Sequence, residues 1–125
     1  MSTLADGRPP VWVGHVSMRT NVIDQSHAFM VSLGLRPVGK GEDVAVLELR
    51  GGTHLVLLRT DQPLSGTAPF DLTVEDLEAT HTRLVELGFS PSPIASGRIH
   101  RSFTVRDPSG QDVAFNSNHV SGRPV

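Results

Sequence analysis

The sequence predicts an α+β fold in which two β-α-β-β-β units together form a curved sheet. Its 125 residues suit a single domain. A shift of 54 positions places residues 33–37 (LGLRP) on residues 87–91 (LGFSP). A shift of 58 positions places residues 52–57 on residues 110–115. Two diverged copies of one unit explain both matches, and such a repeat determines the architecture.

The repeats define the organisation of this single domain. One copy covers about residues 11–60 and the other about residues 69–118. A linker at about residues 61–68 joins them. Residues 1–10 are polar and end in two prolines, so we expect them to form an arm before the first strand.

The first copy begins with an alternation of apolar and polar residues over residues 11–20, which is typical of a half-buried strand. A helix is predicted over residues 24–33, with Asn21 and Asp24 as an N-capping pair and Gly34 at its C-terminal end. The remaining strands of this copy are predicted over residues 35–38, 44–50 and 53–59, the last two joined by the turn Gly51-Gly52.

The second copy repeats this order. A strand over residues 70–74 precedes a helix over residues 76–87, which Gly88 ends. Three more strands are predicted near residues 92–94, 99–106 and 111–116, with residues 107–110 (DPSG) as a turn. The apolar strand faces and inward helix stripes predict a core of Val16, Met18, Ile23, Val31, Leu33, Leu55, Leu57, Phe70, Leu72, Val74, Leu77, Leu84, Leu87, Val113 and Phe115.

The composition argues against several classes of protein. The chain has no cysteine, which excludes disulfides, thiolate metal sites and cysteine nucleophiles. A formal charge of −2 and an aromatic content of 5% argue against nucleic-acid binding. Uninterrupted apolar runs do not exceed four residues, so we expect neither a membrane segment nor a signal peptide, and a cytoplasmic location.

Several ordered segments carry a family resemblance. They are Gly14-His15-Val16, the helix end LGLRP, residues 74–89 (VEDLEATHTRLVELGF) and residues 106–116 (RDPSGQDVAFN). This set resembles the vicinal oxygen chelate superfamily of glyoxalases, extradiol dioxygenases and bleomycin-resistance proteins. The resemblance implies paired modules around a cleft that binds a small molecule, within a homodimer.

The resemblance also implies four metal-ligand positions. In this sequence they are His15, Val56, Pro69 and Ala114. Only His15 carries a donor, and one imidazole cannot hold zinc, nickel or iron. We therefore expect the usual metal site to be absent and no cofactor to be bound there.

Other donors lie one strand step from these positions. His54 precedes Val56 by two residues, Asp71 follows Pro69 by two, and Asp112 precedes Ala114 by two. Strand residues two apart share a face, so these three side chains would join His15 in the cleft. They could form a displaced site for a divalent metal, or line a polar cleft that binds a ligand without metal.

The other polar residues are less informative. His100 opens the long strand of the second copy and could reach the cleft, whereas His27, His81 and His119 are expected to be packing, surface or tail residues. Glu48 could face the cleft or solvent. Arg98, Arg101 and Arg106 could bind a substrate carboxylate or remain solvated. Two functions stay open: a metal-free binding protein for a small polar molecule, and a metal-dependent lyase or dioxygenase using His15, His54, Asp71 and Asp112.

Overall fold

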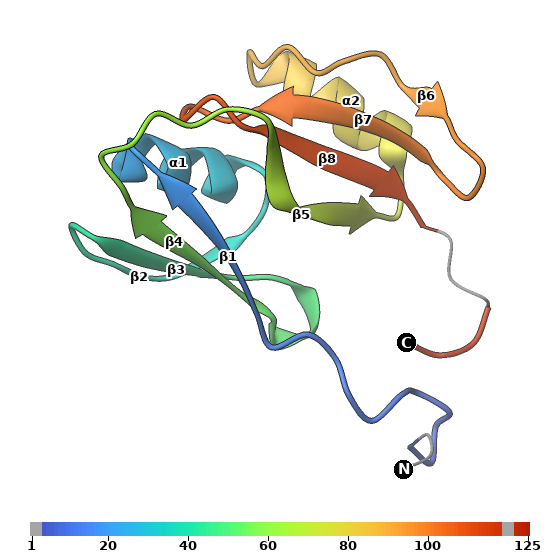
Figure 1. The fold of residues 1–125 in the computed structure, drawn as a ribbon. Helices are drawn as coiled ribbons and strands as arrows, with labels where there is room; N and C mark the ends of the chain where they lie inside the picture. The colour runs from blue at the N-terminus through green and yellow to red at the C-terminus, as the bar shows by residue number, and fades with distance from the viewer. Residues whose placement is uncertain (1–3, 119–121) are drawn as a thin grey trace.

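The computed structural model describes residues 4–118 and 122–125, and it divides into two modules of the same order (Figure 1). His119 lies outside the described residues. Module 1 consists of β1 (His15–Thr20), α1 (Ile23–Ser32), β2 (Arg36–Lys40), β3 (Val44–Glu48), the 3₁₀ turn η1 (Arg50–Gly52) and β4 (His54–Arg59). Module 2 consists of β5 (Thr67–Val74), α2 (Leu77–Glu86), β6 (Ala95–Ser96), β7 (Arg101–Arg106) and β8 (Asp112–Ser117). The predicted α+β class and the paired β-α-β-β-β order are confirmed.

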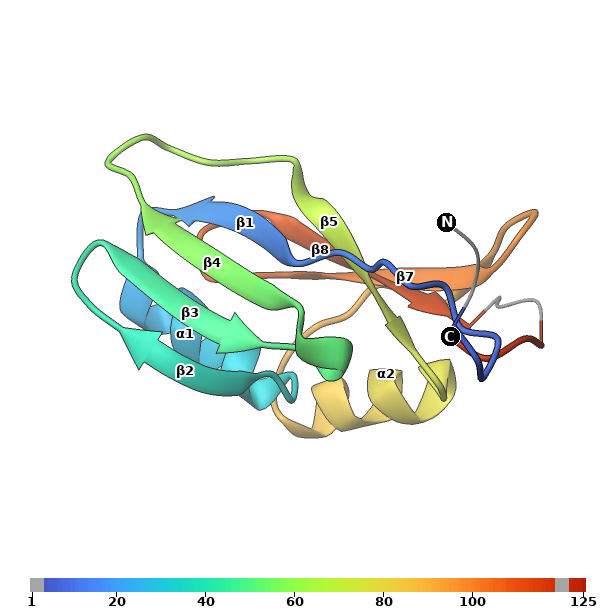
Figure 2. The same cartoon turned by 90° about the horizontal axis from the view of Figure 1, so that it is seen from below.

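Each module forms its own four-stranded sheet. The strand orders are β1-β4-β3-β2 and β5-β8-β7-β6. The first strand of each module pairs in parallel with the last, and the other pairs are antiparallel. β1 and β5 lie side by side and run in nearly opposite directions, so the boundary between them is the inter-module seam (Figure 2).

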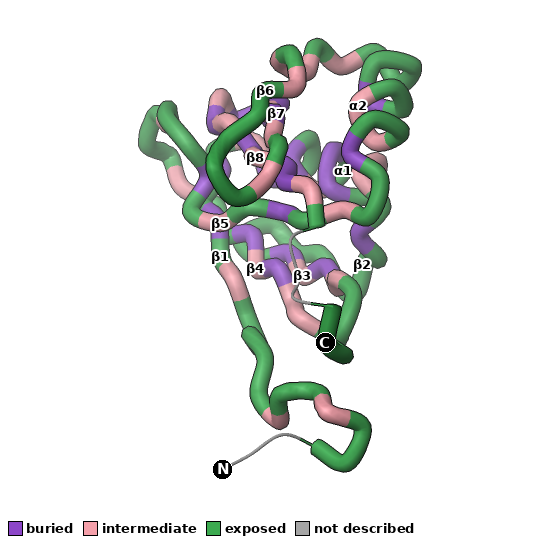
Figure 3. The backbone as a smooth tube through the Cα atoms, turned by 90° about the vertical axis from the view of Figure 1, so that its right-hand side faces the viewer, coloured by how far each residue is buried: buried purple, intermediate pink, exposed green. Residues whose placement is uncertain are grey.

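The two helices cover one face of the paired sheets and leave the other face open (Figures 2 and 3). Strand periodicity decides which side chains reach each face, because neighbours along a strand point to opposite sides. On β1, Met18 and Thr20 are buried toward the helices, whereas His15, Ser17 and Arg19 are exposed. Among the described residues, no helix has the length and apolar character needed to cross a membrane.

The core follows the predicted strand parity and lies between the sheets and the helices. Nine predicted residues are buried: Met18, Ile23, Leu55, Leu57, Leu72, Leu77, Leu84, Val113 and Phe115. Val16, Leu33, Phe70 and Val74 pack against this core while partly exposed. The prediction was wrong for Val31 and Leu87, which are exposed near the helix ends. It also missed core residues, among them Phe29, Met30, Leu47, Phe103 and Val105.

Both helices end at a glycine, as predicted. Gly34 and Gly88 take φ values of 107° and 92°, in the left-handed region that disfavours residues with a Cβ. The same hydrogen bonds recur, with the Leu35 amide donating to the Met30 carbonyl and the Phe89 amide to the Leu84 carbonyl. The two modules therefore have the same structure at their helix ends.

Some predicted boundaries were wrong. α1 begins at Ile23 after Val22, and no side chain caps it, so the Asn21–Asp24 capping pair is absent. Asp24 forms an ion pair with Lys40 instead. The strand expected near residues 92–94 lies at Ala95–Ser96. β5 begins at Thr67, inside the expected linker.

Candidate functional site

A row of four polar side chains crosses the open face of module 1. Arg36, Glu48, His54 and His15 are successive cross-strand partners on β2, β3, β4 and β1. The His15 and His54 rings lie 5.8 Å apart between centroids. His54 Nε2 lies 3.1 Å from Glu48 Oε2, and Arg36 forms an ion pair with Glu48 Oε1. The predicted pairing of His15 with His54 on one face is therefore observed, and Glu48 belongs to the same row.

Glu48 holds this polar row together. The Arg36 guanidinium lowers the pKa of the Glu48 carboxyl through its hydrogen bond and charge, and His54 adds to this effect. An ionised carboxylate only accepts hydrogen bonds. His54 Nε2 must then donate to Glu48, which leaves Nδ1 as the acceptor of a neutral His54 ring.

An apolar patch borders the polar row. Val46 and Val56 are cross-strand partners and half-buried, and Val44 and Leu58 form the next pair, both exposed. The open face of module 1 thus combines imidazole and carboxylate groups with an apolar surface. Binding surfaces for small organic molecules usually have this combination.

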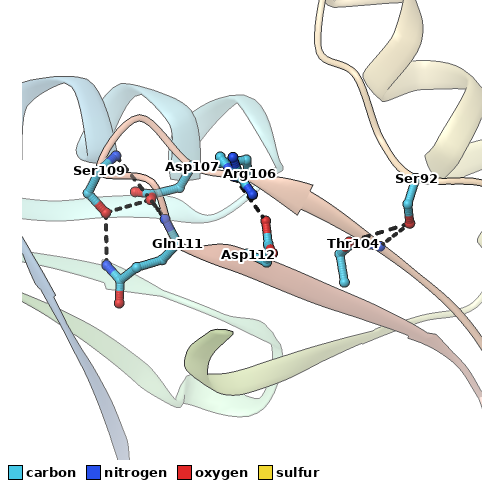
Figure 4. Close-up of polar contacts among 7 residues, drawn as sticks. All are labelled: Ser92, Thr104, Arg106, Asp107, Ser109, Gln111 and Asp112. Carbon is cyan, nitrogen blue, oxygen red and sulfur yellow. Dashed lines mark hydrogen bonds and ion pairs between the residues drawn. The ribbon is translucent and has the colours of Figure 1, made fainter. Parts of the chain in front are cut away.

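The two predicted carboxylates lie on module 2. Asp112 Oδ1 is 3.2 Å from Arg106 Nε (Figure 4). Asp71 lies on β5 opposite Ala114 of β8 and is exposed. Asp71 makes no side-chain hydrogen bond or ion pair within residues 4–118 and 122–125. The two carboxylates therefore differ: Asp112 is paired with a cation, and Asp71 is available to bind a ligand.

The remaining predicted polar residues do not converge. His100 lies in the loop before β7, where its carbonyl accepts from the Gly97 amide. Arg101 forms an ion pair with Glu78 of α2, and Arg98 is exposed. His81 is a packing residue as expected, because its Nε2 lies 2.9 Å from the Ser92 carbonyl and its ring meets Phe103 edge-on.

The residues present do not fit the metal centre that the family resemblance implies. Val56, Pro69 and Ala114 offer no side-chain donor. Across the part of the chain that the structure describes, no three His, Asp or Glu side chains are close enough together to hold a metal ion. His15, His54, Asp71 and Asp112 therefore do not form one displaced cluster within a single chain.

One end of the inter-module seam is closed by a buried polar network that the sequence did not reveal. Ser26 Oγ of α1 donates to Asp107 Oδ2 at 2.9 Å, across 81 residues of chain. Thr20 Oγ1 lies 2.6 Å from Ser26 Oγ. Since the Ser26 hydrogen is used on Asp107, Thr20 is the donor to Ser26.

Module 2 completes this network around Asp107. The amides of Ser109 and Gln111 and the Ser109 hydroxyl donate to Asp107 Oδ1 at 3.0, 3.1 and 2.5 Å (Figure 4). Gln111 Nε2 donates to the Arg19 carbonyl of β1 at 2.8 Å. All five side chains, from Thr20 to Gln111, are at most 7% exposed. We call this region the closed end of the seam.

The opposite end of the seam contains a cavity of about 400 Å³, which we call the seam cavity. Its walls come from the start of β1, the η1 turn and β5. They consist of Val13, Val16, Leu49, Arg50, Thr53, Phe70, Asp71, Leu72 and Thr73. Asp71 is the predicted site residue that lines it. A second cavity of about 440 Å³, beside the N-terminal arm and Trp12, shares Arg50 and Thr53 with it.

Paired β-α-β-β-β modules with an open sheet face define the vicinal oxygen chelate class of proteins. The family model of the glyoxalase-like domain matches residues 15–115, and the chain belongs to that family. Comparison with curated protein sequences gives no match.

Solved structures share the fold at low sequence identity. Lactoylglutathione lyase from Agrobacterium tumefaciens is 19% identical with a TM-score of 0.75, over 92% of this chain and 99% of the other. The antibiotic-binding protein TnmS3 from Streptomyces sp. CB03234 is 22% identical with a TM-score of 0.71, over 86% and 95%. The bleomycin-binding protein from Streptomyces verticillus, solved with copper(II)-bleomycin, is 21% identical with a TM-score of 0.67, over 86% and 97%.

Proposed function

We propose that this protein binds a small polar organic molecule on the open face of its sheets, without a resident metal ion. The proposal rests on the identity of the side chains at the family's four metal-ligand positions. Three of them lack a donor, while the neighbouring polar row is intact. Such a surface can still recognise a ligand by hydrogen bonds and apolar contact.

The ligand contacts proposed here are His15 and His54, together with Asp71 in the seam cavity. His100 and Asp112, the other predicted contacts, lie on module 2 apart from the imidazole pair. His54 is oriented by Glu48, so its Nδ1 is presented as a hydrogen-bond acceptor beside the His15 ring. Val13 lines the seam cavity, and His15, two residues further along the chain, begins β1. Two residues of chain span at most about 7 Å, so the cavity and the imidazole pair lie within reach of one ligand.

The names of two structural neighbours agree with a binding role. TnmS3 is described as an antibiotic-binding protein, and the Streptomyces verticillus protein binds bleomycin. These proteins share the fold with this chain at 22% and 21% identity. They support the class of function proposed for this chain.

We further propose that the protein acts as a homodimer. Val11, Trp12 and Val13 are 60–69% exposed on the extended segment that precedes β1. This segment projects away from the two modules (Figures 1 and 3). Three consecutive exposed apolar residues are costly in water and suit a contact with a second copy.

Elemental analysis tests the metal-free part of the proposal. The protein, grown with added zinc, nickel, iron and manganese, should carry far less than one metal ion per chain. About one ion per chain in the parent, lost in both His15→Ala and His54→Ala but kept in His27→Ala, would overturn it. That result would instead establish a displaced metal site, which the alternative of a metal-dependent lyase or dioxygenase requires.

Thermal-shift screening tests the binding part. A set of small organic acids, alcohols and amines should contain compounds that raise the midpoint of unfolding, because a ligand of the folded state stabilises it. His15→Ala and His54→Ala should each reduce this shift, while His27→Ala on α1 should retain it. A hit whose shift is unchanged in both variants would contradict the assigned site.

A further inference from the structure

The two ends of the seam have corresponding positions in the two modules, yet different side chains occupy them. In both modules the turn before the last strand has the same backbone bonds. The Leu49 amide donates to the Thr53 carbonyl and the Asp107 amide to the Gln111 carbonyl, both at 2.8 Å. Leu49 and Thr53 therefore correspond to Asp107 and Gln111. Asp107 and Gln111 fill the closed end with a buried network, while Leu49 and Thr53 line a cavity.

The open end is bridged at the surface alone. Arg50 of η1 forms an ion pair of 2.9 Å with Glu75, which follows β5, and both side chains are at least 75% exposed. Arg50 belongs to module 1 and Glu75 to module 2, so this pair links the two modules across the open end. Exposed ion pairs contribute little to stability, so no contact among the described residues seals the cavity as the buried network seals the closed end.

The polar groups of the seam cavity leave one charge unbalanced. The charges of Arg50 and Glu75 cancel each other. The Thr53 hydroxyl already donates to the Val13 carbonyl at 2.6 Å. Within the described residues, Asp71 and Thr73 have no side-chain partner. The cavity thus presents an uncompensated carboxylate and a free hydroxyl, about 6.6 Å apart on one strand face.

The rest of the wall is apolar. It consists of Val13, Val16, Leu49, Phe70 and Leu72. Phe70 and Val16 occupy equivalent positions in the two modules, and both line the cavity where β1 and β5 meet. Such walls favour a ring or a branched alkyl group, because burying its apolar surface is favourable.

We propose that the seam cavity binds an organic cation with an apolar body, and that Asp71 is the counter-ion of its amine or guanidine group. This rests on the proposed function and specifies its ligand class. The carboxylate accepts hydrogen bonds from the cation, and Thr73 can accept a further one. A neutral or anionic analogue of the same shape would lose this contact or be repelled.

Three probes with one apolar body test the proposal: 1-naphthylmethylammonium, 1-naphthalenemethanol and 1-naphthoate. Each is titrated into the full chain and followed by the backbone amide NMR signals. We expect the ammonium to bind about tenfold more tightly than the alcohol, which corresponds to about 1.4 kcal/mol. The naphthoate should bind more weakly than either. Shifts should centre on Phe70–Thr73, Val13 and Arg50.

Two variants separate the role of Asp71 from a general charge effect. Asp71→Asn should remove the difference between ammonium and alcohol. Glu86→Gln, which deletes one exposed acidic group at the C-terminal end of α2, should keep it. Added salt should weaken ammonium binding in the parent and leave alcohol binding unchanged, because screening acts on the charge contact.

Three results would overturn the inference. They are equal affinity of ammonium and alcohol in the parent, an ammonium preference that survives in Asp71→Asn, and no shift at the cavity with any probe. None of these decides the proposed function, which depends on the screen with the His15 and His54 variants. Conversely, a failed screen together with a selective ammonium site at Asp71 would reject the assigned imidazole contacts and keep the cavity.

Discussion

Glu48 connects the two halves of the polar row, because Arg36 and His54 bind its separate oxygens. Its lowered pKa means that folding favours the ionised form. The stability this provides is fully present above the usual glutamate pKa of about 4.3 and is lost as the pH falls through the lower folded value. Glu48→Gln should therefore lower the midpoint of thermal unfolding at pH 7 by about one or two degrees.

The pH dependence distinguishes this effect from a loss of packing. The midpoints of parent and Glu48→Gln should converge as the pH is lowered below about 4, because the parent then loses the same charge. Glu42→Gln provides the comparison, since Glu42 makes no ion pair in the described part of the chain. A gap between parent and Glu48→Gln that stays constant down to about pH 2 would contradict this account.

At the scale of single residues, the sequence predicted positions on a strand face better than interactions. Alternation placed His15 and His54 on one face, and the structure confirms their proximity. The same reasoning put Asp71 and Asp112 on the corresponding face of module 2. It could not reveal that Arg106 forms an ion pair with Asp112, or that Arg36 and His54 both contact Glu48. Those contacts depend on the register between strands.

At the scale of elements, the contact between α1 and the β7–β8 turn supports the closed end. Ser26→Ala removes the donor to Asp107 Oδ2 and the acceptor of the Thr20 hydroxyl. Two buried polar groups then lose their partner, so we expect a loss of about 1–3 kcal/mol in the free energy of unfolding. Urea unfolding measures it.

Ser32→Ala is the matched control for this prediction. Ser32 lies on the same helix, and its hydroxyl donates to the Phe29 carbonyl within that helix. Its replacement should change stability by less than about 0.5 kcal/mol. Equal losses in the two variants would show that the Ser26 contact with module 2 has no special role.

The elements themselves were predictable where local chemistry decides them. Gly34 and Gly88 mark helix ends because a positive φ is required at those positions. β6 was misplaced because it has two residues and no periodicity. The closed end was not predictable, since the DPSG segment indicates a turn and nothing local pairs Asp107 with Ser26 81 residues away.

At the scale of the whole molecule, the proposed dimer predicts a mass of about twice 13.4 kDa in light scattering at micromolar concentration. Trp12 is the single tryptophan and is 69% exposed in the isolated chain. Its fluorescence should therefore shift to shorter wavelength as the protein concentration rises, because a contact with a second copy removes water from the indole.

Substitution distinguishes the role of Trp12 from that of other exposed apolar residues. Trp12→Ala should weaken dimerisation by about tenfold or more, as truncation of a buried interface tryptophan does. Val85→Ala on α2 should leave it unchanged, although Val85 is 53% exposed. A mass of one chain at about 100 µM, with tryptophan emission typical of water, would reject the dimer.

The unequal ends of the seam have a mechanical consequence. A buried network fixes the modules to each other at one end, whereas a solvated ion pair spans the other. Relative motion of the modules should therefore be a rotation with its pivot near Asp107, and its amplitude should grow toward Arg50. Such a hinge would let the distance between Val16 and Phe70 change while the pivot stays intact. If both ends of the seam held the same buried network, neither end could open relative to the other.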